Sequence, residues 1–342
     1  MVTAAAPRAV TRARIASIAT YVPPRVLTNE DLEKMVDTSD EWIVKRTGIR
    51  ERHIAEKGVG TSDLAYEAAR TAIARAGLTP NDIDLIVVGT TTPDMAFPST
   101  ACRLQAKLGA SHAWGFDLSA ACSGFTYSVT TAAQIVAAGG SRHALAIGAD
   151  VMSSIIDYTD RATCVLFGDG AGAVVIEPSD DDRIGILDFE NYVDGTGGDA
   201  LCMPAGGSLR PASEQTLANR LHYVKQEGQT VFKFAVRNME EVCRRILERN
   251  RIDPSTLDLL AAHQANMRIV QSTAEKLGMP LDKVLINIDK YGNTTGGTIP
   301  LVLNDAVEQG RLKRGDLVLL ASVGAGFTVG AVLVRWGLKE PS

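Results

Sequence analysis

The sequence has little that would suit a membrane or a nucleic acid. No apolar run among its 342 residues reaches the length of about 20 that a membrane-spanning helix needs. The first dozen residues, MVTAAAPRAVTR, lack the apolar segment of a signal peptide, and residues 1–12 are expected to form a flexible tail. The net charge of −5 argues against a protein that binds nucleic acid through its overall charge. We therefore expect a cytoplasmic protein with no membrane span.

The few cysteines are scattered along the chain, which argues against a metal site and against disulfides. No C-x-x-C pair occurs and no histidine belongs to an H-E-x-x-H motif, so the sequence predicts no metal site. An odd number of cysteines without a secretory signal indicates free thiols. We expect one of them to be reactive and the others to fill the core; the five are Cys102, Cys122, Cys164, Cys202 and Cys243.

Helical and strand patterns alternate along the rest of the chain, which is typical of a layered α/β fold. Residues 61–77 predict a helix with a small apolar face. Residues 84–91 (DLIVVGTT), 143–151 (HALAIGADV) and 316–324 (DLVLLASVG) predict strands that are apolar on both faces. Such strands are central ones, in sheets covered on both sides.

Two segments in the first half of the chain have counterparts in the second. ARAGLTPNDIDLIVVGTT, from Ala74, is echoed by ERNRIDPSTLDLLAAHQA from Glu248, and AKLG, from Ala106, by EKLG from Glu275. The two echoes occur in the same order and at nearly equal offsets along the chain. We therefore predict a duplicated α/β unit with halves 13–180 and 181–342.

The segment DLSAACSGF, residues 117–125, places a cysteine where an apolar strand gives way to a helix. The helix predicted after it, residues 123–140, has no polar face and is expected to be buried all round. Its N-terminal N–H groups are expected to lower the pKa of the Cys122 thiol and make it a nucleophile. The competing interpretation is a packed core thiol.

A histidine and an asparagine occupy comparable places in the second half. His263 follows the strand predicted at 257–262 (LDLLAA), and Asn293 follows a strand predicted at 284–288 (VLINI). The offset from Cys122 to Asn293 is close to the offset between the echoed segments. If the halves pack about a pseudo-twofold axis, the three side chains converge at the carboxyl ends of strands. Cysteine, histidine and asparagine together are typical of acyl and thioester chemistry.

Two further stretches have a predicted role in binding. Residues 323–330 (VGAGFTVG) present backbone N–H groups suited to an oxyanion hole. Residues 39–53 are rich in Lys and Arg around Trp42, which suits a phosphorylated ligand that carries a base. The glycines of residues 167–177 (FGDGAGAVVIE) are followed by a strand pattern rather than a helix, so they do not form a dinucleotide-binding loop.

Six segments then occur in one order: SDEWIVKRTGIRERHIA, AACSGF, YTDRATCVLFGDGAGA, HQANMR, YGNTT and GFTVGAVLVRW. From about Ala13 to Trp336 they resemble the β-ketoacyl-acyl-carrier-protein synthase III family of the thiolase superfamily. The resemblance implies a thiolase-like, duplicated α-β-α-β-α layered fold and a homodimer. It also implies an acyltransferase that condenses a short acyl-CoA primer with malonyl-acyl-carrier protein, releasing CO₂ and CoA and initiating fatty acid synthesis. No cofactor is implied, because the CoA thioester is a substrate.

The resemblance also implies roles for particular residues. Cys122 would accept the acyl group and His263 and Asn293 would assist condensation, while the backbone of Cys122 and Ala325 would form the oxyanion hole. Phe97 would reach across the dimer to floor the acyl pocket, which favours short primers. The CoA contacts would be Thr38, Trp42, Arg46, Arg161, Asn266 and Arg268. Carrier-protein docking would use Gln264, Ala265, Asn266, Met267, Arg268 and Lys233.

The sequence departs from the family pattern at two places, and other functions compete with this hypothesis. The glycines at 296 and 297 are expected to loosen the loop after Asn293, and Val323 replaces a frequent aromatic. A degradative thiolase needs a second cysteine in the C-terminal glycine loop, which has none. A hydroxymethylglutaryl-CoA synthase needs an extra acid near the cysteine, for which there is no clear candidate. A synthase-III-like acyltransferase or condensing enzyme of secondary metabolism shares every motif, and a non-catalytic dimeric scaffold would leave Cys122 unreactive.

Overall fold

Two sheets, one from each half of the chain, form the frame of the computed structural model, which describes residues 11–338. The first sheet has the order β1 (Ala13–Tyr21), β7 (Gly170–Pro178), β6 (Ala144–Asp150), β4 (Leu85–Gly89), β5 (Trp114–Leu118). The second has the order β11 (Leu259–Ala262), β12 (Leu317–Gly324), β13 (Thr328–Arg335), β8 (Gly185–Val193). Parallel pairing joins β4 to β5 and β6, and β11 to β12, while the other neighbours in these two sheets are antiparallel.

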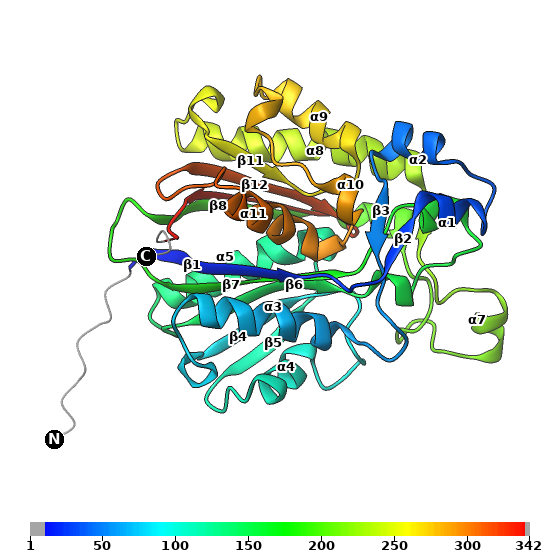
Figure 1. Ribbon diagram of the computed structural model, residues 1–342, viewed down its shortest axis with the longest axis horizontal. Coiled ribbons are helices and arrows are strands. Elements are labelled where there is room, and N and C mark those ends of the chain that lie inside the picture. Colours follow the sequence, from blue (N-terminus) through cyan, green and yellow to red (C-terminus); the bar gives the residue numbers. More distant parts are fainter. Residues whose placement is uncertain (1–10, 339–342) are drawn as a thin grey trace.

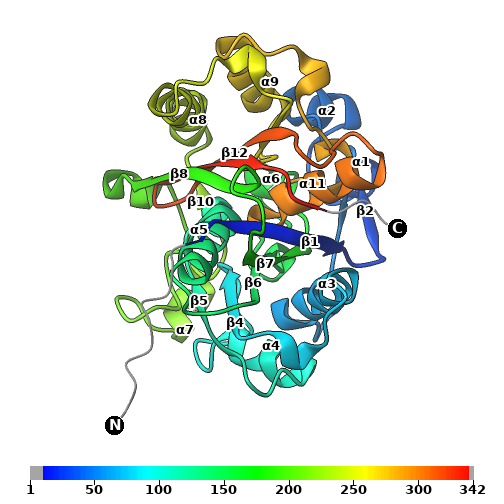
Figure 2. The same cartoon turned by 90° about the vertical axis from the view of Figure 1, so that its left-hand side faces the viewer.

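Helices fill the space between the two sheets and cover their outer faces (Figures 1 and 2). The middle layer holds α5 (Gly124–Ala137) and α11 (Thr298–Glu308). The first sheet is covered by α3 (Thr61–Arg75) and α4 (Thr100–Leu108), and the second by α8 (Gly228–Arg249) and α9 (Met267–Lys276). The predicted duplicated α-β-α-β-α architecture is therefore confirmed.

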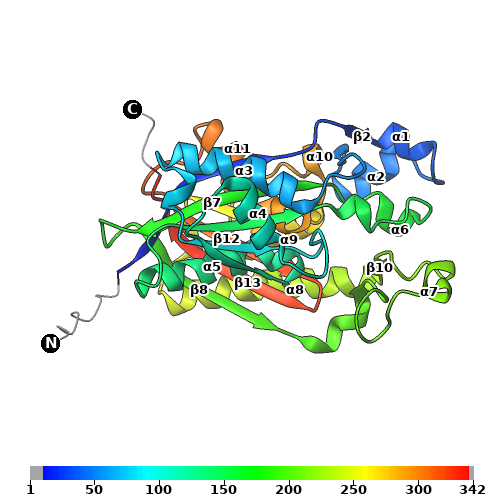
Figure 3. The ribbon, with the colours of Figure 1, turned by 90° about the horizontal axis from the view of Figure 1, so that it is seen from below.

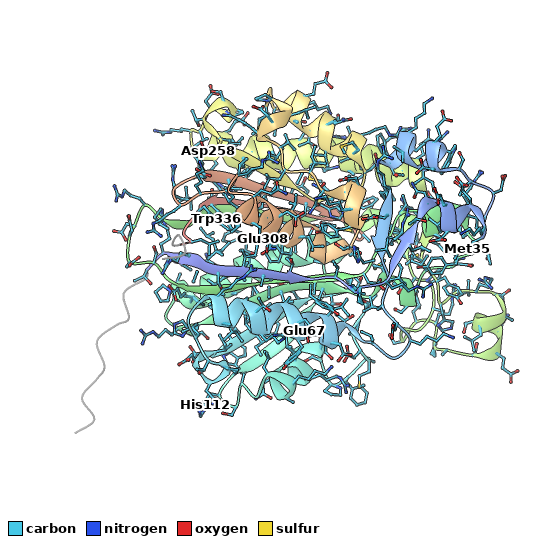
Figure 4. The ribbon with its side chains drawn as sticks, viewed as in Figure 1. Met35, Glu67, His112, Asp258, Glu308 and Trp336 are labelled. Atoms are coloured by element: carbon cyan, nitrogen blue, oxygen red, sulfur yellow. The ribbon has the colours of Figure 1, made fainter. Side chains whose placement is uncertain are left out.

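The middle layer is largely apolar. Most of helix α5 is buried, including Phe125 and Val129. One core cluster joins these side chains to strands of both sheets and to Trp336, which follows β13 and is 1% exposed (Figure 4). The prediction of a helix buried all round is wrong for one face, on which Gln134 is exposed and Tyr127 and Thr131 are half-buried. No helix in the described part of the chain is long and apolar enough to cross a membrane.

Short elements gather at one end of the layers, on the right in Figures 1 and 3. The helices there are α1 (Asn29–Glu33), α2 (Asp40–Thr47), α6 (Arg161–Cys164), α7 (Glu214–Ala218) and α10 (Ile288–Tyr291). Two small two-stranded antiparallel sheets accompany them, with the strands β2 (Val26–Thr28), β3 (Glu51–His53), β9 (Leu201–Cys202) and β10 (Lys225–Gln226). Single 3₁₀ turns connect other elements: η1 (Pro80–Asp82), η2 (Ala121–Ser123), η3 (Met152–Ser154), η4 (Gly195–Ala200), η5 (Pro254–Thr256), η6 (Leu281–Lys283) and η7 (Thr295–Gly297).

The structure corrects the register of the repeat around the site. Three pairs of elements have the same offset between the two halves. Strand β11 follows β4, turn η7 follows η2 and helix α11 follows α5 by the same number of residues. The counterpart of Cys122 in this register is therefore Gly296, and not Asn293, which lies before η7. The strand predicted at 284–288 is also wrong, because only Val284 forms an isolated bridge, with Leu260, and α10 begins at Ile288.

Candidate active site

A cavity of about 620 Å³ opens among the short elements and brings the three predicted catalytic side chains together. Cys122, His263 and Asn293 all line it, although they come from three distant parts of the chain. Cys122 also lines a smaller chamber of about 130 Å³, which shares Phe167 and Leu201 with the cavity. The rest of its lining is Thr91, Ala121, Met152, Ile155, Cys202, Met203, Val224, Thr295 and Ala325. Cys122 thus lines both the main cavity and a small, mainly apolar chamber.

Cys122 lies in η2, directly before α5, at the predicted junction between strand and helix. Ala121 before it has a φ of 47°, a left-handed conformation that is costly for a residue with a side chain and often marks a functional site. Burial raises the pKa of the Cys122 thiol to about 12, and the charge of Asp150 adds to the shift. The expectation of a lowered pKa is therefore wrong for this state of the protein, since desolvation disfavours the thiolate.

His263 follows β11 and is buried at 1% exposure. Its backbone N–H donates to the carbonyl of Ala321 at 2.8 Å, and its Nδ1 lies 2.6 Å from the Thr298 hydroxyl oxygen. Its Nε2 is buried and has no hydrogen-bond partner in the structure. Burial lowers the pKa of His263 to about 3, so the imidazole is neutral at physiological pH.

Asn293 is held by the backbone around it. The side-chain oxygen of Asn293 accepts a hydrogen bond from the backbone N–H of Thr295 at 2.9 Å. The backbone N–H of Asn293 donates to the carbonyl of Leu166 at 2.9 Å. The first bond fixes the orientation of the amide, because a flipped amide would set an NH₂ group against the Thr295 N–H. The NH₂ end of Asn293 is therefore the end free to serve as a donor to a ligand.

Asp150, at the carboxyl end of β6, ties the two halves together beneath the site. One carboxylate oxygen accepts from the Thr91 N–H at 2.8 Å and from the hydroxyls of Thr90, Thr91 and Thr92 at 3.0–3.1 Å. The other accepts from the N–H of Gly296 at 3.1 Å, close to Asn293. The carboxylate is fully buried, and it is in no ion pair within residues 11–338. Burial raises the pKa of Asp150, and these hydrogen bonds act in the opposite direction by favouring the ionised form.

The glycine pair after Asn293 is closely packed, against the expectation of a loose loop. A Cβ added to Gly148 of β6 would lie 2.2 Å from the carbonyl oxygen of Gly296, so the two backbones touch. A Cβ on Gly297 would lie 3.1 Å from the carbonyl oxygen of Gly170. Val323 is 7% exposed and lines the large cavity together with Cys122.

The C-terminal glycine loop approaches the nucleophile directly. A Cβ added to Gly324 would lie 2.7 Å from the backbone nitrogen of Cys122, so only glycine allows this approach. Ala325, the next residue, lines the small chamber. The backbone N–H groups of Cys122 and Ala325 thus belong to segments in contact, as an oxyanion hole requires.

The mouth of the large cavity carries the predicted cationic patch. The guanidinium groups of Arg46 and Arg161 lie 4.9 Å and 5.2 Å from the centre of the Trp42 ring. The side chains of Asn266 and Arg268 donate to the carbonyl of Arg46 at 3.0 Å and 3.1 Å, which joins α2 to α9.

The remaining predicted binding residues are distributed unevenly around this mouth. Thr38 has a buried hydroxyl without a partner, but it does not line the cavity. Arg268 and Lys233 are exposed, while Ala265 and Met267 are half-buried. Phe97 lines neither the cavity nor the chamber and is 84% exposed in this single chain.

Two residues of the predicted binding segments are buried instead. Gln264 is 1% exposed and donates to the carbonyls of Ala262 and Leu285, so its side chain cannot meet a docking protein. Arg52 is fully buried and donates to the carbonyls of Leu27 and Val165 and to the Asn29 side chain. It supports the cavity wall at Val165 and is not part of the cationic patch.

Sequence reasoning missed Asp150 and Thr298. A signal for Asp150 was available, since it is an acidic residue that ends an otherwise apolar strand, ALAIGAD. Thr298 carries no sequence signal of its own, and only the distance to His263 reveals it. Residues 11–338 contain no group of three or more metal-ligating side chains placed to hold an ion.

A cysteine, a neutral histidine and an asparagine at one cavity of a duplicated five-layered fold are typical of a thiolase-like acyltransferase. Comparisons with known proteins narrow this class. The family described as "3-Oxoacyl-[acyl-carrier-protein (ACP)] synthase III" matches residues 116–195, and its C-terminal part matches residues 247–336. The β-ketoacyl-acyl-carrier-protein synthase III of Koribacter versatilis is 57% identical over 328 residues, which is 96% of this chain and 98% of the relative.

Solved structures agree. The crystal structure of the synthase III from Aquifex aeolicus is 45% identical with a TM-score of 0.87, covering 95% of this chain and 100% of its own. The priming β-ketosynthase of a polyketide biosynthetic pathway is 34% identical with a TM-score of 0.89, covering 98% and 99%. This chain belongs to the β-ketoacyl-acyl-carrier-protein synthase III family and is a condensing acyltransferase.

Proposed function

We propose that this enzyme transfers a short acyl group from CoA to Cys122 and condenses it with malonyl-acyl-carrier protein. The products are 3-oxoacyl-acyl-carrier protein, CO₂ and CoA, and the reaction starts fatty acid synthesis. The observation that carries the proposal is the meeting of Cys122, His263 and Asn293 at one cavity, with a smaller, mainly apolar chamber that Cys122 also lines. The relative at 57% identity favours this role over secondary metabolism, where the comparable identity is 34%.

The first half-reaction is acyl transfer to Cys122. The thiol is protonated at rest because burial raises its pKa to about 12. Sulfur attacks the thioester carbonyl, the backbone N–H groups of Cys122 and Ala325 stabilise the tetrahedral oxyanion, and CoA leaves with the proton. Removing one such donor in other enzymes costs about 3–4 kcal/mol of transition-state stabilisation.

The second half-reaction uses the two neutral donors. Malonyl-acyl-carrier protein loses its carboxylate as CO₂, and the enolate oxygen that forms accepts hydrogen bonds from His263 Nε2–H and the Asn293 NH₂. The enolate carbon attacks the acyl carbonyl, and the Cys122 thiolate that is released takes up one proton. Because loss of CO₂ drives bond formation, the proposed reaction needs no metal and no redox cofactor.

The cavity mouth suits the nucleotide end of CoA. An adenine enters between the Trp42 ring and the Arg161 guanidinium, which are 5.2 Å apart and part to admit it. Arg46 and Arg268 supply positive charge along the path toward Cys122, with Asn266 between them, and Thr38 has an unpaired hydroxyl near the start of α2.

An acidic carrier protein docks on the same rim in the second half-reaction. Arg268 and Lys233 are exposed cations, and Ala265, Asn266 and Met267 directly precede Arg268 in the chain. Gln264 takes no direct part because it is buried. The carrier's phosphopantetheine arm then follows the path that CoA has left.

The small chamber that Cys122 lines limits the primer. Its volume is only about 130 Å³, against about 620 Å³ for the main cavity. Met152, Ile155 and Val224 lie in its walls, and packed side chains do not yield to several extra methylenes without strain. We therefore favour acetyl and short branched acyl groups.

We also propose a cytoplasmic homodimer. Strand β5 is an edge strand whose residues are only partly buried, and Trp114 within it is 52% exposed. An apolar open edge of this kind is a pairing site. Met95 and Phe97 lie on the loop between β4 and α4, and their side chains are 40% and 84% exposed. Strand β4 is the neighbour of the edge strand β5 in the first sheet. Phe97 then reaches the partner's acyl chamber. The variant Trp114→Asp should be a monomer when its mass is measured by light scattering.

A panel of acyl-CoA primers with malonyl-acyl-carrier protein tests the proposal. We expect acetyl-CoA or isobutyryl-CoA to give the highest kcat/KM, with an acyl adduct on Cys122 detected by mass spectrometry before malonyl-acyl-carrier protein is added. Preference for dodecanoyl-CoA would contradict the primer assignment, and absence of the adduct would contradict the role of Cys122.

A further inference from the structure

The hydroxyl of Thr298 is the only side-chain partner of the His263 ring in the described structure. Thr298 is the first residue of α11, is 2% exposed, and places its Oγ1 2.6 Å from His263 Nδ1. The same hydroxyl lies 3.2 Å from the carbonyl oxygen of Thr295. On the other side of the ring, Nε2 has no partner within residues 11–338 and His263 lines the large cavity. Nothing in the proposed mechanism so far uses Thr298.

The direction in which the Thr298 hydroxyl donates its proton decides which ring nitrogen of His263 carries the single N–H of the neutral imidazole. A neutral imidazole has one N–H, so Thr298 either donates to a bare Nδ1 or accepts from an Nδ1–H and donates to Thr295. The separation of 2.6 Å is a close hydrogen bond whichever atom donates, so the assignment depends on the other acceptor that the hydroxyl proton could reach. The longer contact to Thr295, at 3.2 Å, is outside the O–H range.

We propose that Thr298 is a positioning residue that donates to Nδ1 and so fixes His263 as the Nε2–H tautomer. The inference rests on the proposed role of His263 in decarboxylation and explains how a neutral histidine reaches the competent form. With the proton on Nε2, the ring presents a donor to the cavity where the enolate oxygen develops. The opposite tautomer would present a lone pair to that oxygen and repel it.

Three variants separate this role from a structural one. Thr298→Val keeps the shape of the side chain and removes the hydroxyl, and Thr298→Ser keeps the hydroxyl. Thr100→Val is the matched control, because Thr100 is also the buried first residue of a helix, α4, and its hydroxyl has no partner. Acyl loading of Cys122, CO₂ release from malonyl-acyl-carrier protein and ¹⁵N chemical shifts of labelled His263 are measured for each.

We expect the wild type and Thr298→Ser to show the Nε2–H tautomer, and Thr298→Val to show a mixture. Decarboxylation should fall about 10- to 100-fold in Thr298→Val, part of the 10²–10³ that loss of an oxyanion donor costs, with loading unchanged. Thr298→Ser should recover most of the rate, and Thr100→Val should behave as wild type in all three measurements. An Nδ1–H tautomer in the wild type, or unchanged decarboxylation in Thr298→Val, would overturn the inference.

His263→Ala, measured alongside, keeps the two proposals apart. If it decarboxylates as fast as the wild type, the role proposed for His263 fails, and the NMR result alone decides whether Thr298 sets the tautomer. If it loses activity while Thr298→Val does not, only the inference about Thr298 is wrong.

Discussion

Replacing Asp150 by Asn removes a buried charge without changing the shape of the side chain. The carboxylate accepts four hydrogen bonds on one oxygen, from Thr90, Thr91 and Thr92, and one on the other, from the N–H of Gly296. The amide oxygen of an Asn can keep the first set. Its NH₂ group must then face the N–H of Gly296, so that two donors oppose each other.

The cost follows from the bonds lost. A hydrogen bond to a charged group contributes about 1.5–3 kcal/mol, and a buried donor left without a partner costs about 1–3 kcal/mol. We therefore expect Asp150→Asn to lower the free energy of unfolding by about 3–5 kcal/mol and to displace the loop that carries Asn293. Because the charge of Asp150 raises the pKa of Cys122, the same substitution should lower that pKa.

Urea unfolding and iodoacetamide labelling of Cys122 under native conditions measure the two effects. Asp84→Asn is the control, because Asp84 accepts from the backbone N–H groups of Arg142 and His143 at the other end of β6, away from Cys122. We expect it to lose less stability and to label at the wild-type rate. Asp150→Asn with wild-type stability, or with slower labelling of Cys122, would refute the reasoning.

Three further predictions concern the thiol, the rim and the chamber. Below a pKa of about 12 the thiolate fraction of Cys122 rises tenfold per pH unit, so its labelling rate should rise about tenfold per unit from pH 6 to 9; a plateau in that range would contradict the raised pKa. Arg268→Glu should weaken binding of the carrier protein at least tenfold by titration, and the exposed Lys313→Glu should not; equal binding by both would remove Arg268 from the docking surface. Phe97→Thr should raise kcat/KM for octanoyl-CoA relative to acetyl-CoA with CO₂ release unchanged, and an unaltered ratio would place the chamber floor elsewhere.

Local patterns in the sequence predict an α/β fold with a duplicated unit, whereas the five-layered arrangement is implied only by the family resemblance. Apolar strands at 84–91, 143–151 and 316–324, and the echo of residues 74–91 in residues 248–265, predict the two sheets and the duplication that the structure shows. The largely buried helix after Cys122 follows from its lack of a polar face. These features depend on burial, and burial is encoded in the pattern of apolar residues.

Features that depend on tertiary contacts could not be predicted from the sequence. The segment at 284–288 is as apolar as a strand, but it forms only one bridge, because α10 begins at Ile288. The pKa of Cys122 follows from the packing around it, which outweighs the helix N-terminus assumed from the sequence. Gln264 and Arg52 belong to polar segments and yet are buried, because backbone carbonyls from distant residues accept their hydrogen bonds.

The division of labour between Cys122 and the pair His263 and Asn293 is the central claim, and one measurement tests it directly. Transfer of radiolabelled acetyl from acetyl-CoA to the enzyme is followed separately from CO₂ release from malonyl-acyl-carrier protein, in His263→Ala and Asn293→Ala. The account predicts acetyl transfer near the wild-type rate and decarboxylation reduced about 10²- to 10³-fold in both variants, as for loss of an oxyanion donor. Failure of acetyl transfer with intact decarboxylation would contradict it.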